Sequence, residues 1–194
     1  MKWNEILPGL WRFADSCNVY AVLAPDGMLI IDAGTGRWLD HLDQLPAHPA
    51  ALLLTHYFRD HSAGAVRAAR VGIPVYAGEH DRNKYIDPAQ HFRERKTYMI
   101  YDCEWDLFAP IEAVPLADVL HDYASVDLAG LAIEIVPLPG APMSQIGFGI
   151  TLPQTGEQVV FSGETIHSPG RVPRLSPLQY DYCDSPGLAN VYYS

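Results

Sequence analysis

The feature that most constrains the fold is the run Ala51–Leu54, an apolar segment that ends abruptly at Thr55. It is followed at once by His56, and then by Asp60 and His61. This order indicates a buried strand whose carboxyl end carries imidazole and carboxylate side chains, and open α/β sheets place their chemistry at such strand ends. The sequence therefore predicts an α/β domain with a polar site just beyond residue 54.

Strand and helix patterns alternate around this run. A β-hairpin pattern with central turn residues covers 18–32. Helical spacing follows over 37–45, a second helix is expected over 63–71, and a further strand over 73–77. Strands that alternate with helices in this way predict an α/β sheet with right-handed βαβ connections and helices covering it.

The second half of the chain is expected to consist of strands, at 131–136, 146–152 and 158–161. Between 78 and 125, charged and aromatic residues mix without a clean period, which predicts an insertion or a lid. A chain of 194 residues, 48% of them apolar, suffices for one core. We therefore expect a single domain over 1–194.

Charge and composition exclude several classes of partner. The formal net charge is −10 and the 13 Lys and Arg form no run, which argues against a nucleic-acid partner. No stretch approaches the roughly 20 apolar residues of a membrane span, and the first residues lack the apolar core of a signal peptide. The three cysteines form neither a disulfide framework nor a thiolate zinc pattern. We expect a cytoplasmic protein with an unknown small-molecule substrate and no membrane partner.

The order T-H-x-x-x-D-H-S-x-G-A over 55–65 resembles the signature loop of the metallo-β-lactamase superfamily, H-x-H-x-D-H. Two later loops, 139–144 and 161–164, are similar to the family's Pro-Gly-His and strand-Gly-Asp loops. The resemblance implies a metallo-β-lactamase-like αββα four-layer sandwich over 18–194. It also implies that the turn after residue 31 supports the floor of the site, in preference to a phosphate-binding role. The family's final His would lie beyond the last residue, as in a truncated chain.

The resemblance also implies a reduced metal site. The family's first metal is held by three His, which correspond here to His56, Phe58 and Ala141, so that site is expected to be empty. The second metal would be held by Asp60, His61 and Glu164, the last in place of the family's bridging Asp. These donors suit one divalent ion, with zinc expected and iron or manganese as alternatives. Asp60 would also orient the water that the ion activates.

Each of these residues has a second interpretation. Asp60 equally suits a cap for the helix near Ala63, and His61 suits a hydrogen-bonded structural role. His56 suits a buried His with its hydrogen bonds satisfied, and Glu164 suits a simple turn. His167 is a substitute ligand if its segment is helical. Three other histidines are expected to be solvated or peripheral: His80, His91 and His121.

Two functions from different classes follow. The first is a single-metal hydrolase that acts on an ester, thioester, lactone or phosphoester. The second is a family member without catalysis, and without a bound metal, that serves as a binding or interaction scaffold, because function depends on the site and not on the fold. Exposed apolar side chains at 191–193 would favour a homodimer.

Overall fold

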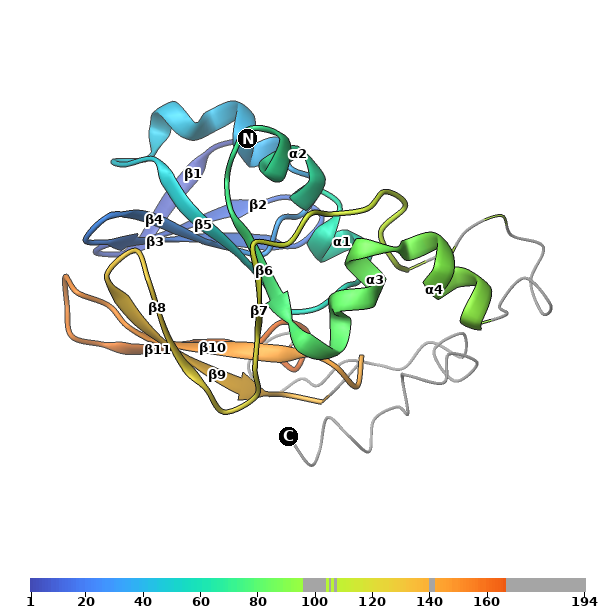
Figure 1. Cartoon of the computed structure of the whole chain (residues 1–194). Helices are drawn as coiled ribbons and strands as arrows, with labels where there is room; N and C mark the ends of the chain where they lie inside the picture. Colours follow the sequence, from blue (N-terminus) through green and yellow to red (C-terminus); the bar gives the residue numbers. More distant parts are fainter. Residues whose placement is uncertain (96–103, 105, 107, 140–141, 167–194) are drawn as a thin grey trace.

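Two β-sheets stacked face to face form the body of the protein (Figure 1). The structure, a computed structural model, describes residues 1–95, 104, 106, 108–139 and 142–166. The first sheet contains seven strands: β1 (Trp3–Leu7), β2 (Leu10–Ala14), β3 (Asn18–Ala24), β4 (Gly27–Ile31), β5 (Pro49–Leu54), β6 (Val75–Gly78) and β7 (Asp118–Leu120). The second contains four: β8 (Ser125–Leu128), β9 (Leu131–Pro137), β10 (Ile146–Thr151) and β11 (Gln158–Phe161).

Short helices connect the strands of the first sheet. They are η1 (Arg37–Gln44), α1 (Arg59–Ser62), α2 (Ala65–Arg70), η2 (Glu79–Asp81), α3 (Arg82–Ile86) and α4 (Pro88–Arg95). In Figure 1, α2 lies on the side of the first sheet that faces away from the second sheet. Within the described ranges no helix is long and apolar enough to cross a membrane.

Strand β5 is buried on both faces, which explains its continuous apolar sequence. Leu52 and Leu54 pack in a core with the helices, together with Ala65 and Ala68 of α2. The alternate side chains, among them Leu53, belong to a second core between the two sheets. The sheet order is mixed, since β1 to β4 pair antiparallel and β4 to β7 pair parallel. The carboxyl ends of β4 and β5 therefore lie side by side.

The structure confirms the hairpin over 18–32 and the strands predicted near 51–54, 73–77, 131–136, 146–152 and 158–161. The helix expected over 37–45 is a 3-10 helix with a kink at His41. The helix expected over 63–71 is α2, which begins at Ala65, just after Gly64; the short helix α1 precedes the predicted range. A Cβ at Gly64 would lie 2.5 Å from the carbonyl oxygen of Ala33, so the chain passes too closely there for any other residue.

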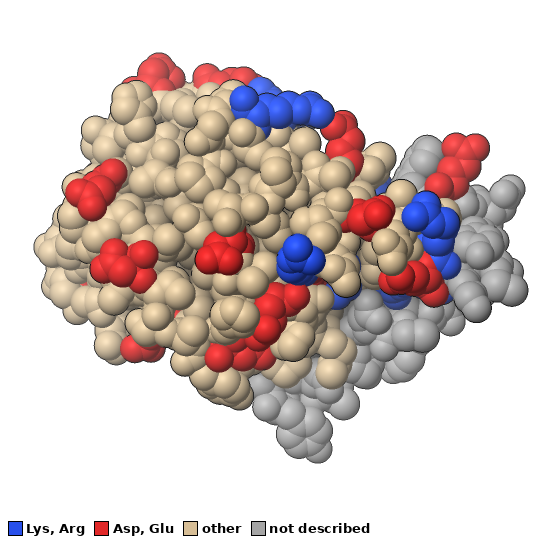
Figure 2. Space-filling view, in the orientation of Figure 1, with Lys and Arg blue, Asp and Glu red and all other residues tan. Residues whose placement is uncertain are grey.

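The described residues test the remaining predictions only in part. The range 78–125, predicted as an insertion or lid, contains η2, α3, α4 and β7 among its described residues. Residues 191–193, on which the homodimer prediction rests, lie outside the described residues. In the view of Figure 2, Lys and Arg side chains are scattered among acidic ones. The absence of a nucleic-acid partner stays a prediction.

Candidate metal centre

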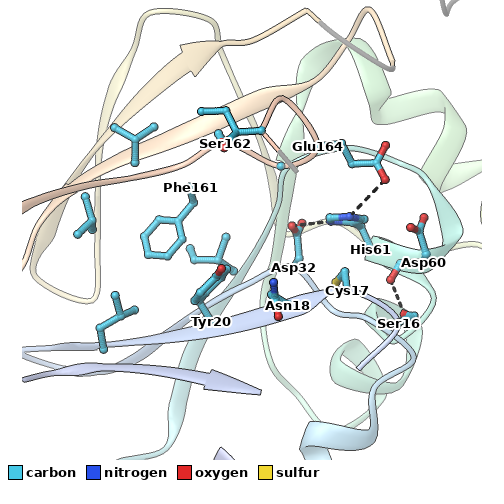
Figure 3. A pocket seen from close by; sticks show the side chains of 16 residues that line it. Ser16, Cys17, Asn18, Tyr20, Asp32, Asp60, His61, Phe161, Ser162 and Glu164 are labelled. Carbon is cyan, nitrogen blue, oxygen red and sulfur yellow. Dashed lines mark hydrogen bonds and ion pairs between the residues drawn. The ribbon is translucent and has the colours of Figure 1, made fainter. Parts of the chain in front are cut away.

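Polar side chains from both sheets meet beyond the carboxyl ends of β4 and β5 (Figure 3). Asp32 follows β4, and His56 follows β5 after Thr55. His61 comes from α1, and Glu164 comes from the turn after β11 in the second sheet. In Figure 3 the ring of His61 lies between the carboxylates of Asp32 and Glu164.

Asp32 is the support of this site. It is 4% exposed and its backbone has φ of 60°. Its carboxylate accepts hydrogen bonds from the backbone N–H and the hydroxyl of Thr55, at 2.9 Å each to Oδ1. It also accepts one from Nδ1 of His61 at 2.8 Å. The predicted role of this turn, support for the floor of the site, is confirmed.

The hydroxyl of Thr55 determines the tautomer of His56. A carboxylate only accepts hydrogen bonds, so Thr55 gives its one proton to Asp32. The same oxygen lies 2.9 Å from Nδ1 of His56, and that nitrogen must therefore be the donor of their hydrogen bond. Burial, and then the charge of His61, lower the pKa of His56 well below its usual value. His56 is thus neutral, and its Nε2 carries a free lone pair.

That lone pair has no partner. Nε2 of His56 is buried and makes no hydrogen bond within the described part of the chain. The alternative of a fully satisfied buried His56 is therefore wrong at this atom. The rings of His56 and His61 are 4.3 Å apart, centroid to centroid. One donor atom each from His56, His61 and Glu164 lies within 4.8 Å of the other two.

His61 and Glu164 interact electrostatically. Burial alone would lower the pKa of His61, but the charge of Asp32 and its hydrogen bond outweigh burial and raise it to about 12. Burial, and then repulsion by Asp60, raise the pKa of Glu164 to about 7. Nε2 of His61 lies 3.8 Å from Oε1 of Glu164. The carboxyl groups of Asp32 and Glu164 thus lie on either side of the His61 ring.

The turn that presents Glu164 depends on a glycine. Gly163 has φ of 54°, and a Cβ there would lie 2.8 Å from Oε1 of Gln145 and 3.1 Å from the hydroxyl of Thr55. The same Oε1 accepts a hydrogen bond from the backbone N–H of Glu164 at 3.0 Å. Gln145 is buried, and this hydrogen bond holds the turn in place.

Asp60 lies at the rim of the site. It is exposed and is not one of the three clustered donors, although it lines the same cavity of about 500 Å³ as His61 and Glu164. The cap expected from Asp60 is absent, because α1 and α2 have no side-chain capping hydrogen bond. Its backbone carbonyl instead accepts a hydrogen bond from the hydroxyl of Ser16 at 2.5 Å.

Phe58 fills the position where the family has its second His. It is 5% exposed, and its ring packs against those of His56, Tyr57 and Phe108 at centroid distances of 5.2, 5.0 and 5.5 Å. Aromatic packing has thus replaced a donor at this position. Ala141 and His167 lie outside the described residues.

The other three histidines differ in their exposure to solvent. His80 and His121 have mostly exposed side chains, as expected. His91 is only 8% exposed, so the expectation that it is solvated or peripheral is wrong. It lies on the buried side of α4, where its ring contacts Tyr57, and the loose sequence pattern of that region gave no sign of burial.

Sequence reasoning did not identify Thr55, Gln145 or Cys17 as parts of the site. Cys17 lines the cavity beside His61, and burial raises the pKa of its thiol. None of the three belongs to a ligand-type motif. Only the abrupt polar end of the β5 run marked Thr55.

No protein-family model matches the sequence, and no curated protein matches it. Solved structures do match. The chain is similar to the metallo-β-lactamase of Cronobacter sakazakii with the HARLDQ motif, at a TM-score of 0.71 and 18% identity over 100% of this chain and 72% of that chain. It is similar to FEZ-1 of Legionella gormanii (TM-score 0.64, 17% identity, 94% of this chain, 72% of that chain).

A third match is BJP-1, a subclass B3 metallo-β-lactamase of Bradyrhizobium japonicum. Its TM-score is 0.65 at 18% identity, over 94% of this chain and 70% of that chain. These likenesses extend over nearly the whole chain, and they agree with the two stacked sheets. The chain therefore has the metallo-β-lactamase fold.

Proposed function

We propose that this protein is a hydrolase that depends on one divalent metal ion, held by His56, His61 and Glu164. The observation that carries the proposal is the buried, unpaired Nε2 of His56, which faces two further donors. An imidazole lone pair buried without a partner is costly unless something binds it. Two imidazoles and a carboxylate suit zinc, and iron or manganese are alternatives.

The proposed ligand set differs from the one implied by the resemblance. Asp60 lies outside the cluster, and His56 lies inside it. The set would combine one residue from the family's first metal position with two from the second. One similar solved structure is described by the motif HARLDQ, whose third letter, like Phe58 here, is not His. Another is described as a B3 metallo-β-lactamase with an active-site glutamic acid, so a glutamate occurs in the active site of at least one similar structure.

Each residue has a distinct role in this proposal. A bound ion supplies Lewis-acid polarisation of a substrate carbonyl or phosphoryl oxygen. Asp32 fixes the orientation of His61, and Thr55 fixes the tautomer of His56. Asp60, exposed at the rim of the cavity, is the carboxylate placed to accept a proton from an attacking water.

The cavity suits a substrate with an apolar portion. From His61 and Glu164 it continues to a wall that includes Tyr20, Val159 and Phe161. A second cavity of about 510 Å³ shares Ser16, Asp60 and Glu164 with the first and is lined on its other side by Phe58 and Phe108. An ester, thioester, lactone or phosphoester with an apolar substituent fits this arrangement.

The test measures bound metal and hydrolysis together. Metal-free protein is reconstituted with zinc, manganese or ferrous iron, and His56→Ala, Glu164→Gln and Asp60→Ala are compared with the parent. His56→Ala and Glu164→Gln should each lose one equivalent, whereas Asp60→Ala should keep its metal and lose hydrolysis of model esters, thioesters, lactones and phosphoesters. His48→Ala, which changes an exposed His elsewhere, is the control. Unchanged metal content in His56→Ala and Glu164→Gln would refute the proposal.

A scaffold without catalysis is the second candidate, and one observation favours it. The raised pKa of His61 means that, without a metal, an imidazolium already balances the charges of Asp32 and Glu164. A parent protein that is folded, binds no metal at this cluster and cleaves none of the four substrate classes would support the scaffold.

A further inference from the structure

A second group of metal-type donors lies away from this site, where the two sheets are connected. Glu79 and His80 belong to η2, which follows β6 of the first sheet. His121 and Asp122 lie in the connection from β7 of the first sheet to β8 of the second. We propose that this protein binds a zinc ion at a surface site formed by Glu79, His80 and Asp122, with His121 as the neighbouring fourth donor.

The distances suit a metal with little rearrangement. Nε2 of His80 lies 3.5 Å from Oδ2 of Asp122. Donors bound about 2.1 Å from a tetrahedral zinc ion lie about 3.4 Å from one another. One donor atom each from Glu79, His80 and Asp122 falls within 4.8 Å of the other two, so small rotations of exposed side chains close the set.

His121 lies beside this group of three donors and contacts one of them. Its Nδ1 donates a hydrogen bond to Oε2 of Glu79 at 2.9 Å. That contact, and then the nearby charges of His121 and His80, lower the pKa of Glu79, so its carboxylate is ionised. Two imidazoles with two carboxylates form a set that zinc prefers, whereas calcium and magnesium prefer sites made only of oxygen.

A separate observation points to a missing cation. Oδ1 of Asp122 is buried and has no hydrogen-bond partner among the described residues. The Asp122 side chain is 28% exposed, so this oxygen is shielded while its carboxylate faces the cluster. A buried carboxylate oxygen requires a donor or a cation. Oδ2 of the same carboxylate is the oxygen near His80, so zinc bound there would place a compensating positive charge beside Oδ1.

The backbones that carry the donors are held in place. The turn after Asp122 has Tyr123 at φ of 60°, and hydrogen bonds from Tyr123 N–H to Ile135 O (3.0 Å) and from Ala124 N–H to His121 O (3.2 Å) fix it. On the other side, the Lys84 ammonium donates to the carbonyl of His80 at 3.3 Å. Fixed backbones reduce the entropy lost when donors converge on an ion.

This site shares no residue with the central cluster, so the two can be tested separately. The experiment uses the full chain, stripped of metal, and titrates it with zinc ions alone against a chromophoric chelator. His80→Ala and Asp122→Asn are compared with the parent and with the control His48→Ala. His56→Ala removes the central cluster and isolates the surface site.

We expect His80→Ala and Asp122→Asn each to bind one equivalent less than the parent, or to bind it at least tenfold more weakly. His48→Ala and the parent should show the same rise in melting temperature with zinc. In His56→Ala one equivalent should remain, and it should be lost on adding His80→Ala. Imidazole ¹⁵N signals of His80 and His121 should shift on titration, a readout that does not depend on stability. Parent-like affinity and stoichiometry in both His80→Ala and Asp122→Asn would overturn the proposal.

Discussion

At the scale of single residues, the candidate centre is organised by proton positions. The hydroxyl of Thr55 donates to Asp32, which leaves Nδ1 of His56 as a donor and its Nε2 as a lone pair. Asp32 in turn binds Nδ1 of His61, so that Nε2 of His61 faces Glu164. Two imidazoles are therefore oriented by one carboxylate and one hydroxyl, the kind of second layer that supports metal ligands.

These proton positions predict a steep pH dependence of metal binding. Metal requires the unprotonated imidazole and the ionised carboxylate. The pKa of His61 is about 12 and that of Glu164 about 7. Metal binding must therefore release the proton of His61 above pH 7, and the protons of both His61 and Glu164 below it. The apparent association constant for zinc at the central cluster should rise about tenfold per pH unit from pH 7 to 8.5, and more steeply below pH 7. His80→Ala, measured by chelator competition, isolates this cluster.

The stability of the metal-free protein supplies a control, because it should change with pH in the opposite direction to the zinc affinity. Because the pKa of His61 is raised on folding from 6.5, the stabilisation from its pairing with Asp32 is fully present below pH 6.5. It is lost as pH rises toward 12. Stability in urea should therefore fall over the range in which zinc affinity rises. A zinc affinity that is flat between pH 7 and 8.5 would contradict the assignment of His61 as a protonated imidazole that must release its proton.

Sequence reasoning reached part of this site. The donors His56 and His61 could be located because they follow a buried apolar strand, and Glu164 because it follows another. The relation of these donors to Asp32, Thr55 and Gln145 is spatial, and neither spacing nor composition contains it. Asp60 was predicted as a ligand from its place in the motif. Its position at the exposed start of α1, outside the three-donor cluster, depends on the course of that short helix.

At the scale of elements, strands with buried faces were predictable and strands with exposed faces were not. β5 has four fully enclosed residues in succession, and its apolar run predicts it. β1 exposes three of its five side chains, and β8 has only four residues, none of them buried, so both give a weak strand signal. The η1 segment has helical spacing, but the kink at His41 limits it to 3-10 turns while Trp38 still packs in the core.

The turn between β11 and Glu164 yields a prediction at this scale. Gly163→Ala adds a Cβ 2.8 Å from Oε1 of Gln145, which cannot easily move because its Nε2 donates to the carbonyls of Leu138 and Ser162. We expect a loss of about 1–3 kcal/mol of stability and at least tenfold weaker zinc binding at the central cluster. Urea unfolding and chelator competition measure the two effects.

Gly156→Ala is the matched control for that substitution. Gly156 also has a positive φ, of 74°, but nothing lies within 4 Å of a Cβ placed there. It should show the backbone strain of about 1–2 kcal/mol without any change in zinc affinity. If both variants bind zinc as the parent does, the turn does not position Glu164.

At the scale of the whole molecule, stability depends on the core between the sheets. Phe148 on β10 is fully buried there, together with Leu53 of β5 and Ile31 of β4. Phe148→Ala should cost about 3–5 kcal/mol, from lost burial and from the cavity that remains. Val160→Ala, at an exposed position of the neighbouring strand β11, should cost less than about 1 kcal/mol. Equal losses in urea unfolding would mean that this face is not a packed core.

The architecture of the whole molecule could be predicted from the order of the motifs along the sequence. Identity to the matching solved structures is 16–18%, yet their TM-scores range from 0.64 to 0.72. The resemblance over 55–65 and 161–164 placed two loops at one end of a sandwich, and the structure agrees. Strands β7 and β8 could not be inferred from the sequence. Only their pairing with β6 and β9 in three dimensions shows where they begin and end.

Backbone hydrogen bonds join the two sheets directly. The N–H of Ile146, at the start of β10, donates to the carbonyl of Thr55, just beyond the end of β5, at 2.9 Å. The N–H of Asp26, in the turn between β3 and β4, donates to the carbonyl of Ala129, in the turn between β8 and β9, at 3.0 Å, so the sandwich is also fastened at the end away from the donors. The amide of Ile146 will exchange its hydrogen with solvent only when both sheets separate, so its exchange rate follows global unfolding. Because Thr55 also contacts Asp32 and His56, separation of the sheets at this bond would disturb the geometry of the donors.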